Sequence, residues 1–328
     1  MDKFRTEVFI DDSKQPLKYD SNLMFIGSCF ASNIGQYFTD NCLNTLVNPF
    51  GVLYNPFSIA NSIERLLEER SFTEDEILYA NGMYHTFFHH SQFSRIDKHA
   101  FLEAANTSFH QSVEYIKKAD VVLFTFGTSW VYEHLGTQTV VSNCHKYPAS
   151  DFNRYMLSVD EIVERYEQLL ASIRKVNNSV RFIFTVSPVR HWKDGAHGNQ
   201  LSKSTLLLAI DKLTNTIEGA RYFPAYELLL DDLRDYRFFA DDMLHPSAKA
   251  IEYIREKFIS SQYADEDIAV LKRLAKLVQA SNHRPFNVAT DEHQSFVRNH
   301  INKVNALQKK CTTLNLKTLL LNFEKQRT

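Results

Sequence analysis

The sequence predicts an α/β fold: a three-layer α/β/α sandwich with a mainly parallel sheet, followed by a helical C-terminal appendage. Short apolar, β-branched runs alternate with segments of helical periodicity through most of the chain, which is typical of βαβ units and a parallel sheet covered on both faces. Polar residues directly follow several of these runs. Ligands of such sheets bind beyond the carboxyl ends of the strands, so these polar residues predict a site.

The elements of the first half are read from apolar runs and periodicity. Residues 23–26 form a short apolar run before a small-residue turn, and residues 31–39 then predict a helix. Residues 46–47 are a weaker strand candidate. Asn55-Pro56 opens an amphipathic helix with Ile59, Ile63, Leu66 and Leu67 on one face.

The clearest strand is residues 121–126, a continuous apolar run that ends at Gly127. Ser158 and Glu161 have the spacing of a capping box, so a helix should start there and run through Ile173. Apolar spacing then predicts a strand at 180–186, a helix at 200–218 and a short strand at 220–222.

Beyond about residue 265 the pattern is helical only. Leu271, Leu274 and Leu277 continue the apolar spacing that starts at Ile268, and a second helix is expected over 292–307. We therefore divide the chain into an α/β domain, residues 1–262, and a helical extension, residues 263–328. The extension is expected to pack on the main domain, or else to serve as a dimerisation surface.

Charge and composition exclude several classes of function. The 37 Lys and Arg residues against 39 Asp and Glu leave a net charge of −2, so a nucleic-acid partner is not expected. No stretch is apolar enough to span a membrane, and the N-terminus lacks the apolar run of a signal peptide, which predicts a cytoplasmic protein. The four scattered cysteines and unpartnered histidines suggest no metal site, and no cofactor motif is present. The oligomeric state stays open.

A nucleophile candidate lies at the first strand-to-helix turn, in Gly27-Ser28-Cys29-Phe30-Ala31. A serine here is exposed at the sheet edge, and N–H groups of the following helix can face a developing oxyanion. The alternative interpretation is that Ser28 only caps the helix. Because G-x-S-x-G is absent, the turn is not the nucleophile elbow of the α/β-hydrolases.

A base and its orienting carboxylate are expected in Asp242-Met243-Leu244-His245-Pro246. Serine needs a base to become a nucleophile, and the base needs a carboxylate to hold it. An Asp three residues before a His in a turn can bring the two side chains together. Asp241 is a rival for the orienting role, and a surface turn with a solvated histidine is the non-catalytic alternative.

These two motifs, in this order on an α/β pattern, resemble the SGNH (GDSL-like) hydrolase superfamily, and most closely its GSCFA branch. Residues 27–31 spell that name. The resemblance covers roughly residues 20–260. Within this span, six further stretches also resemble the family: 48–51, 54–56, 126–130, 143–146, 187–191 and 236–240. It implies a flavodoxin-like sheet, with Ser28 as nucleophile, His245 as general base and Asp242 as its orienter.

The resemblance also implies an oxyanion hole made by the Ser28 backbone, a loop glycine and an asparagine. Gly51 fits the glycine by position. The asparagine of the family's Gly-x-Asn is replaced by Ser129 in Gly127-Thr128-Ser129. Thr128, Ser129 or Asn143 remain as candidate donors. Trp130, His145, Arg190 and His191 are candidate substrate-binding residues.

The leading hypothesis is therefore a serine esterase acting on a small-molecule or carbohydrate ester. Acyl transfer to an alcohol by the same triad is the first alternative, because only the second acceptor differs. A non-catalytic binding protein on the same fold, with a decayed oxyanion hole, is the second.

Overall fold

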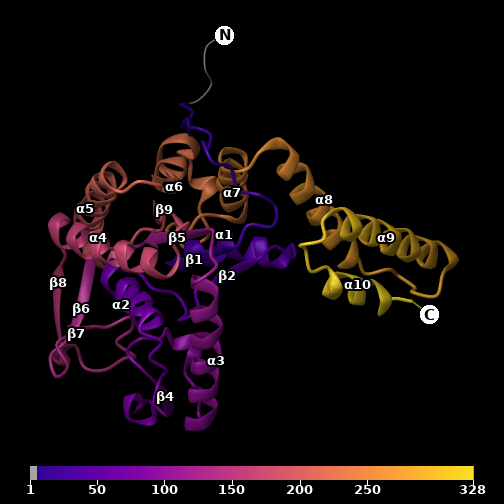
Figure 1. The fold of residues 1–328 in the computed structure, drawn as a ribbon. Helices are drawn as coiled ribbons and strands as arrows, with labels where there is room; N and C mark the ends of the chain where they lie inside the picture. The colour runs from indigo at the N-terminus through magenta and orange to yellow at the C-terminus, as the bar shows by residue number, and fades with distance from the viewer. Residues whose placement is uncertain (1–5, 328) are drawn as a thin grey trace.

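A five-stranded parallel sheet forms the centre of the computed structural model, which describes residues 6–327 (Figure 1). Its strands run in the order β2-β1-β5-β9-β10, which is the flavodoxin-like order 2-1-3-4-5. The predicted α/β fold is confirmed. The strands are β1 (Leu23–Gly27), β2 (Thr45–Val47), β5 (Val121–Phe126), β9 (Arg181–Val186) and β10 (Ala220–Tyr222).

Alternation of side chains along the strands produces the three layers. Successive residues of a strand point to opposite faces, so Met24 and Ile26 enter one core cluster while Leu23 and Phe25 enter the other. Four helices cover the first face: α2 (Pro56–Leu67), α3 (Lys98–Ile116), α4 (Val159–Val176) and α5 (Gly195–Thr216). The second face is covered by α1 (Cys29–Asp40), α7 (Ala248–Gln262) and the segment of α6 (Ala225–Glu227) with the π-helix Leu228–Leu233.

The C-terminal helices α8 (Asp265–Ser281), α9 (Asp291–Lys310) and α10 (Lys317–Glu324) extend from the sandwich as an arm (Figure 1). Buried residues of the arm, such as Leu271 and Val297, belong to the same core cluster as α1 and α7. The predicted boundary after residue 262 falls between α7 and α8, and the division into two domains stays a prediction. In residues 6–327 no helix has the length and apolar character required to cross a membrane.

Several elements were not predicted. A three-stranded antiparallel sheet of β6 (Trp130–His134), β7 (Thr139–Val140) and β8 (Phe152–Met156), and a hairpin of β3 (Leu78–Ala80) and β4 (Met83–His85), lie outside the main sheet. Most of their residues are only partly buried, which weakens the apolar alternation. Helix α3 was not predicted because its buried face contains the small Ala105 and the polar Ser112, which weaken the apolar periodicity.

The turn after β1 depends on Gly27. Its φ is +137°, and a Cβ there would lie 2.1 Å from the backbone oxygen of Thr125. A side chain at this position therefore meets both a forbidden backbone region and a neighbouring strand.

Gly27→Ala is expected to destabilise the protein by more than about 3 kcal/mol, measured as the shift of the urea midpoint. Gly82→Ala is the matched control, because Gly82 also has positive φ (+77°) but a Cβ there would meet nothing within 4 Å. The control should cost about 1–2 kcal/mol. Equal losses in the two variants would contradict the close approach of β1 and β5.

Candidate active site

Ser28 lies at the carboxyl end of β1 and caps helix α1. It is only 1% exposed, so the predicted exposure at the sheet edge is wrong. Its Oγ accepts a hydrogen bond from the Phe30 N–H at 3.3 Å. The cap occupies a lone pair of the hydroxyl and leaves its proton available, so capping and nucleophilic attack are compatible. The next N–H, that of Cys29, stands at the first position of the helix, where no intrahelical acceptor exists.

Cys29 lines the same cavity as Ser28. Burial raises the pKa of its thiol, which keeps the sulfur protonated near neutral pH. Because the thiolate is the reactive form of cysteine, Cys29 is a poor rival to Ser28 as a nucleophile.

Asp242 holds His245 through both carboxylate oxygens. Oδ1 accepts the backbone N–H groups of Leu244 and His245, each at 2.9 Å, and Oδ2 lies 2.6 Å from His245 Nδ1. These bonds, the backbone ones first, lower the pKa of Asp242 to about 2. The turn therefore orients the imidazole with Nε2 left for another partner, and Asp242, not Asp241, is the carboxylate bound to His245.

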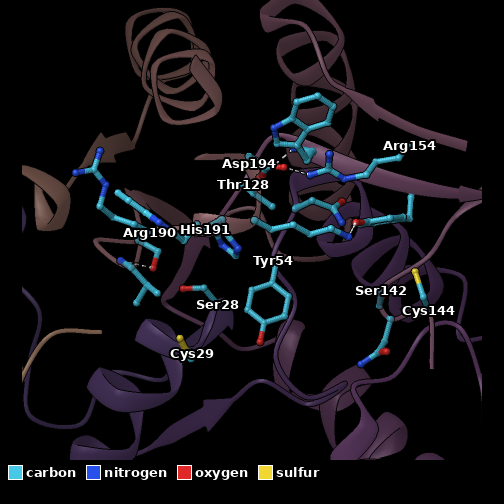
Figure 2. Close-up of a pocket in the computed structure, with 18 of the residues that line it drawn as sticks. Ser28, Cys29, Tyr54, Thr128, Ser142, Cys144, Arg154, Arg190, His191 and Asp194 are labelled. Atoms are coloured by element: carbon cyan, nitrogen blue, oxygen red, sulfur yellow. Dashed lines mark hydrogen bonds and ion pairs between the residues drawn. The ribbon is translucent and has the colours of Figure 1, made fainter. Parts of the chain in front are cut away.

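A cavity of about 480 Å³ brings the separated motifs together. Ser28, from the loop after β1, and His245, from the loop before α7, both line it, and Figure 2 shows Ser28 between Cys29 and His191 on the cavity wall. Within residues 6–327 no hydrogen bond joins Ser28 Oγ to the imidazole of His245. Contacts between nucleophile and base are often loose before substrate binds.

A second hollow of similar size adjoins the first. The two share Arg190 and Trp192, and Asp242 lines the second while His245 lines the first. Trp192 is 53% exposed. The Asp–His pair therefore stands between two concave surfaces, and Trp192 offers an accessible ring to both.

Two of the expected oxyanion donors are already bonded. The N–H of Gly51 donates to Asn48 O at 2.8 Å, and that of Ser28 donates to Thr125 O at 3.1 Å. Gly51 is also absent from the cavity wall. After β2 the backbone turns so that the Gly51 N–H points back into its own loop. The motif alone does not reveal this path.

Thr128, Ser129 and Ser202 form a buried cluster of hydroxyl groups. The hydrogen bonds of this cluster distinguish Thr128 from Ser129 as an oxyanion donor. Ser202 Oγ accepts from the N–H of Ser129 at 2.8 Å and from its hydroxyl at 3.1 Å. With both lone pairs filled, Ser202 must donate to Thr128 Oγ1, 3.0 Å away. Thr128 Oγ1 also accepts from the Trp130 N–H at 3.1 Å. The Thr128 proton is thus left over, and Thr128 lines the cavity whereas Ser129 does not.

The predicted substrate-binding residues divide into two groups. Trp130, Arg190 and His191 line the cavity, although the guanidinium of Arg154 already covers the Trp130 ring at 4.1 Å. Asn143 lines it as well, with Oδ1 bonded to the His145 N–H at 2.8 Å.

His145 does not reach the cavity. Its Nε2 contacts Thr86 O and His89 O at 2.9 and 3.0 Å, and its ring stacks on His85 at 4.1 Å. Burial lowers the pKa of His145 to about 4, so it is a neutral packing residue. In the described part of the chain, these and the other His, Cys, Asp and Glu residues form no group of three that could hold a metal ion.

His191 is a second imidazole in the cavity. Its ring packs edge-on against Tyr54, with centroids 5.6 Å apart, and Asn199 Oδ1 accepts its backbone N–H at 2.8 Å. Burial, and then the nearby Lys203, lower the pKa of His191 to about 4. It is therefore neutral at physiological pH and a rival to His245 as a base.

Lys203 was not predicted. This fully buried side chain of α5 donates to Gly127 O at 2.6 Å and Ser187 O at 2.7 Å. It thereby ties together the loops after β5 and β9, from which Thr128 and Arg190 come. Burial lowers the pKa of Lys203 to about 7.

Two further polar pairs were missed on the far wall of the cavity. Arg154 on β8 pairs with Asp194 (Figure 2). Lys193 Nζ donates to the Tyr132 hydroxyl at 2.7 Å. Neither pair has a local sequence signal, since the partners of each lie on separate elements.

Comparison with known proteins identifies the family. The family model described as GSCFA family matches residues 22–258, and that described as GSCFA domain protein, C-terminal domain, matches residues 274–328. The chain belongs to the GSCFA family. The predicted resemblance is confirmed, and the GSCFA match contains Ser28, Asp242 and His245. No protein of curated function matches the chain.

Solved structures similar to this GSCFA protein are distant. A carbohydrate esterase family 3 protein from Talaromyces cellulolyticus is 15% identical, with 48% of this chain and 63% of that chain covered and a TM-score of 0.28. A mutant acetyl esterase with acetate ion is 11% identical, with 77% and 98% covered and a TM-score of 0.36. An acetyl xylan esterase from Butyrivibrio proteoclasticus is 12% identical, with 74% and 63% covered and a TM-score of 0.38. The chain thus spans under two thirds of two of them, and scores this low support no conclusion about activity.

Proposed function

We propose that this GSCFA protein is a serine esterase of the SGNH type, with Ser28 as nucleophile, His245 as general base and Asp242 as its orienter. The observation that carries the proposal is the shared cavity: Ser28 and an Asp-bound His245, more than two hundred residues apart in the sequence, line the same cavity at the carboxyl edge of the sheet. Serine activated by a carboxylate-held imidazole is the arrangement that acyl transfer requires.

The reaction follows from the free atoms of the three groups. His245 Nε2 takes the Ser28 proton as Oγ attacks the ester carbonyl, and the imidazolium that forms is stabilised by ionised Asp242. The same proton then goes to the departing alcohol. Water, activated by His245, releases the acyl group from Ser28 and regenerates the enzyme.

We assign the oxyanion to the Cys29 N–H, at the positive end of α1, and the Thr128 hydroxyl. The first has no intrahelical acceptor and the second has a proton left over after its cluster is satisfied. This pair replaces the donors expected at Gly51 and in a Gly-x-Asn.

Thr128→Val, which keeps the shape and removes the hydroxyl, is expected to lower kcat about 10²-fold with little change in KM. Thr128→Ser should restore most of the loss. Ser129→Ala is the matched control, because it removes a hydroxyl of the same cluster that does not face the cavity. Equal losses for Thr128→Val and Ser129→Ala would mean that the cluster acts only through packing.

Hydrolysis is favoured over transfer by the exposure of the base. The His245 side chain is 49% exposed, so water can reach the acyl-enzyme beside it. The size of the cavity suits a small-molecule ester, and the exposed ring of Trp192 suits a carbohydrate face.

The test uses short p-nitrophenyl esters, acetylated sugars and a fluorophosphonate probe on the whole chain. We expect hydrolysis of the esters, and labelling that peptide mapping places on Ser28. A folded protein that transfers acetyl to an alcohol without hydrolysis would favour the transferase. Absence of both turnover and labelling would favour a non-catalytic binding protein.

A further inference from the structure

The charge of the active-site cavity is opposite to that of the chain. Arg154, Arg190 and Lys193 line it against a single carboxylate, Asp194, whereas the whole sequence carries −2. The carboxylate is committed to Arg154. Two cationic side chains, Arg190 and Lys193, therefore remain uncompensated on the cavity wall.

Arg190 has no anionic partner. Throughout residues 6–327 the structure gives its guanidinium no hydrogen bond or ion pair, and Nε is buried without an acceptor. The buried ammonium group of Lys203 also lies close enough to repel the Arg190 guanidinium when both are charged. A buried donor without an acceptor is costly, so the guanidinium is suited to an oxygen anion supplied from outside the chain.

The position of Arg190 places such an anion beside the reacting groups. Arg190 follows β9, lines both hollows and packs by Trp192, with Cζ 5.9 Å from the ring centroid. In Figure 2 it lies on the other side of Ser28 from Arg154. An ester bound at Ser28 would therefore have Arg190 within its reach on the side where the two hollows meet.

We propose that the ester substrate carries an anionic group, a carboxylate or a phosphate, and that Arg190 binds it. The claim that the bound anion is part of a substrate rests on the proposed esterase function. The anion site itself does not depend on that function. Lys193, held by the Tyr132 hydroxyl, contributes a longer-range attraction. The proposed class of substrate is thereby narrowed from esters in general to charged ones.

The kinetic test compares matched esters. 4-Nitrophenyl hydrogen glutarate has an anionic acyl part and 4-nitrophenyl butyrate a neutral one; 4-acetoxybenzoate and phenyl acetate vary the alcohol part in the same way. We expect kcat/KM to favour the anionic member of at least one pair, and Arg190→Gln to lower that ratio about tenfold or more. Arg190→Lys should retain part of the preference.

Arg298→Gln is the matched control, since it removes one arginine charge from the exposed surface of α9. It should leave the ratio unchanged. A preference for the neutral member of both pairs, or a ratio that Arg190→Gln does not alter, would overturn the proposal.

A binding measurement separates this proposal from the esterase assignment. Ser28→Ala protein is titrated by calorimetry with glutarate and with inorganic phosphate, and Arg190→Gln is introduced into the same background. Saturable binding that Arg190→Gln abolishes supports the anion site even if no ester is turned over, and the tighter ligand shows which anion is preferred. No saturable heat with either ligand would overturn it.

Discussion

Replacement of Ser28 by alanine is expected to lower kcat on short p-nitrophenyl esters by at least about 10³-fold, because the hydroxyl that forms the acyl-enzyme in the proposed mechanism is then absent. The cap bond to Phe30 N–H is lost as well, which costs about 1 kcal/mol of stability. Circular dichroism and the urea midpoint would show that the variant remains folded. Labelling by the fluorophosphonate should disappear with the activity.

Ser295→Ala is the control for this variant, since Ser295 is an exposed residue of α9 and does not line the cavity. Its activity should equal that of the unchanged protein. Turnover that survives Ser28→Ala, or labelling that moves to Cys29, would end the assignment of Ser28 as the nucleophile.

The sheet could be predicted because its signals are local. The run Val121–Phe126 is apolar almost throughout and is buried on both faces, and the capping box of Ser158 and Glu161 is present as predicted. The antiparallel sheet around Trp130 is only partly buried, so its pattern does not stand out from a loop. What failed was the detection of elements whose apolar face is mixed with polar residues.

The candidate site was predictable only where a motif holds its own partners. Asp242 and His245 are three residues apart and bond directly. Lys203, by contrast, acts through two backbone carbonyls that are 76 and 16 residues away, and carbonyls have no sequence signature. The same reason explains Gly51, since the direction of an N–H depends on the path of the loop.

The hydroxyls of Thr128 and Ser129 differ in the hydrogen bonds that they make. Thr128 and Ser129 were equal candidates in the sequence, and both contact the same Ser202. Counting donors and lone pairs leaves a free proton on Thr128 alone. The hydrogen bonds within the cluster, and not the residue types, therefore show which hydroxyl can donate to a substrate.

His245→Ala is expected to lower kcat about 10³-fold or more, because the Ser28 proton then has no oriented base. Asp242 is ionised at neutral pH, because its folded pKa of about 2 lies below the ordinary 3.8. The ionised carboxylate therefore stabilises the folded Asp–His turn above pH 3.8, and this stabilisation is lost as the pH falls from 3.8 to about 2. The loss in His245→Ala is measured as the ratio of kcat for the unchanged protein to kcat for the variant at about pH 8.

His191→Ala is the discriminating comparison, since both imidazoles line the cavity. His191 has no carboxylate bonded to its ring among the described residues, whereas His245 does, so we expect its removal to cost about tenfold at most. Added imidazole should partly restore His245→Ala, because the half-exposed position leaves room for it. A larger loss in His191→Ala than in His245→Ala would transfer the role of base to His191, and Asp242 would then serve the fold of its turn and not the chemistry.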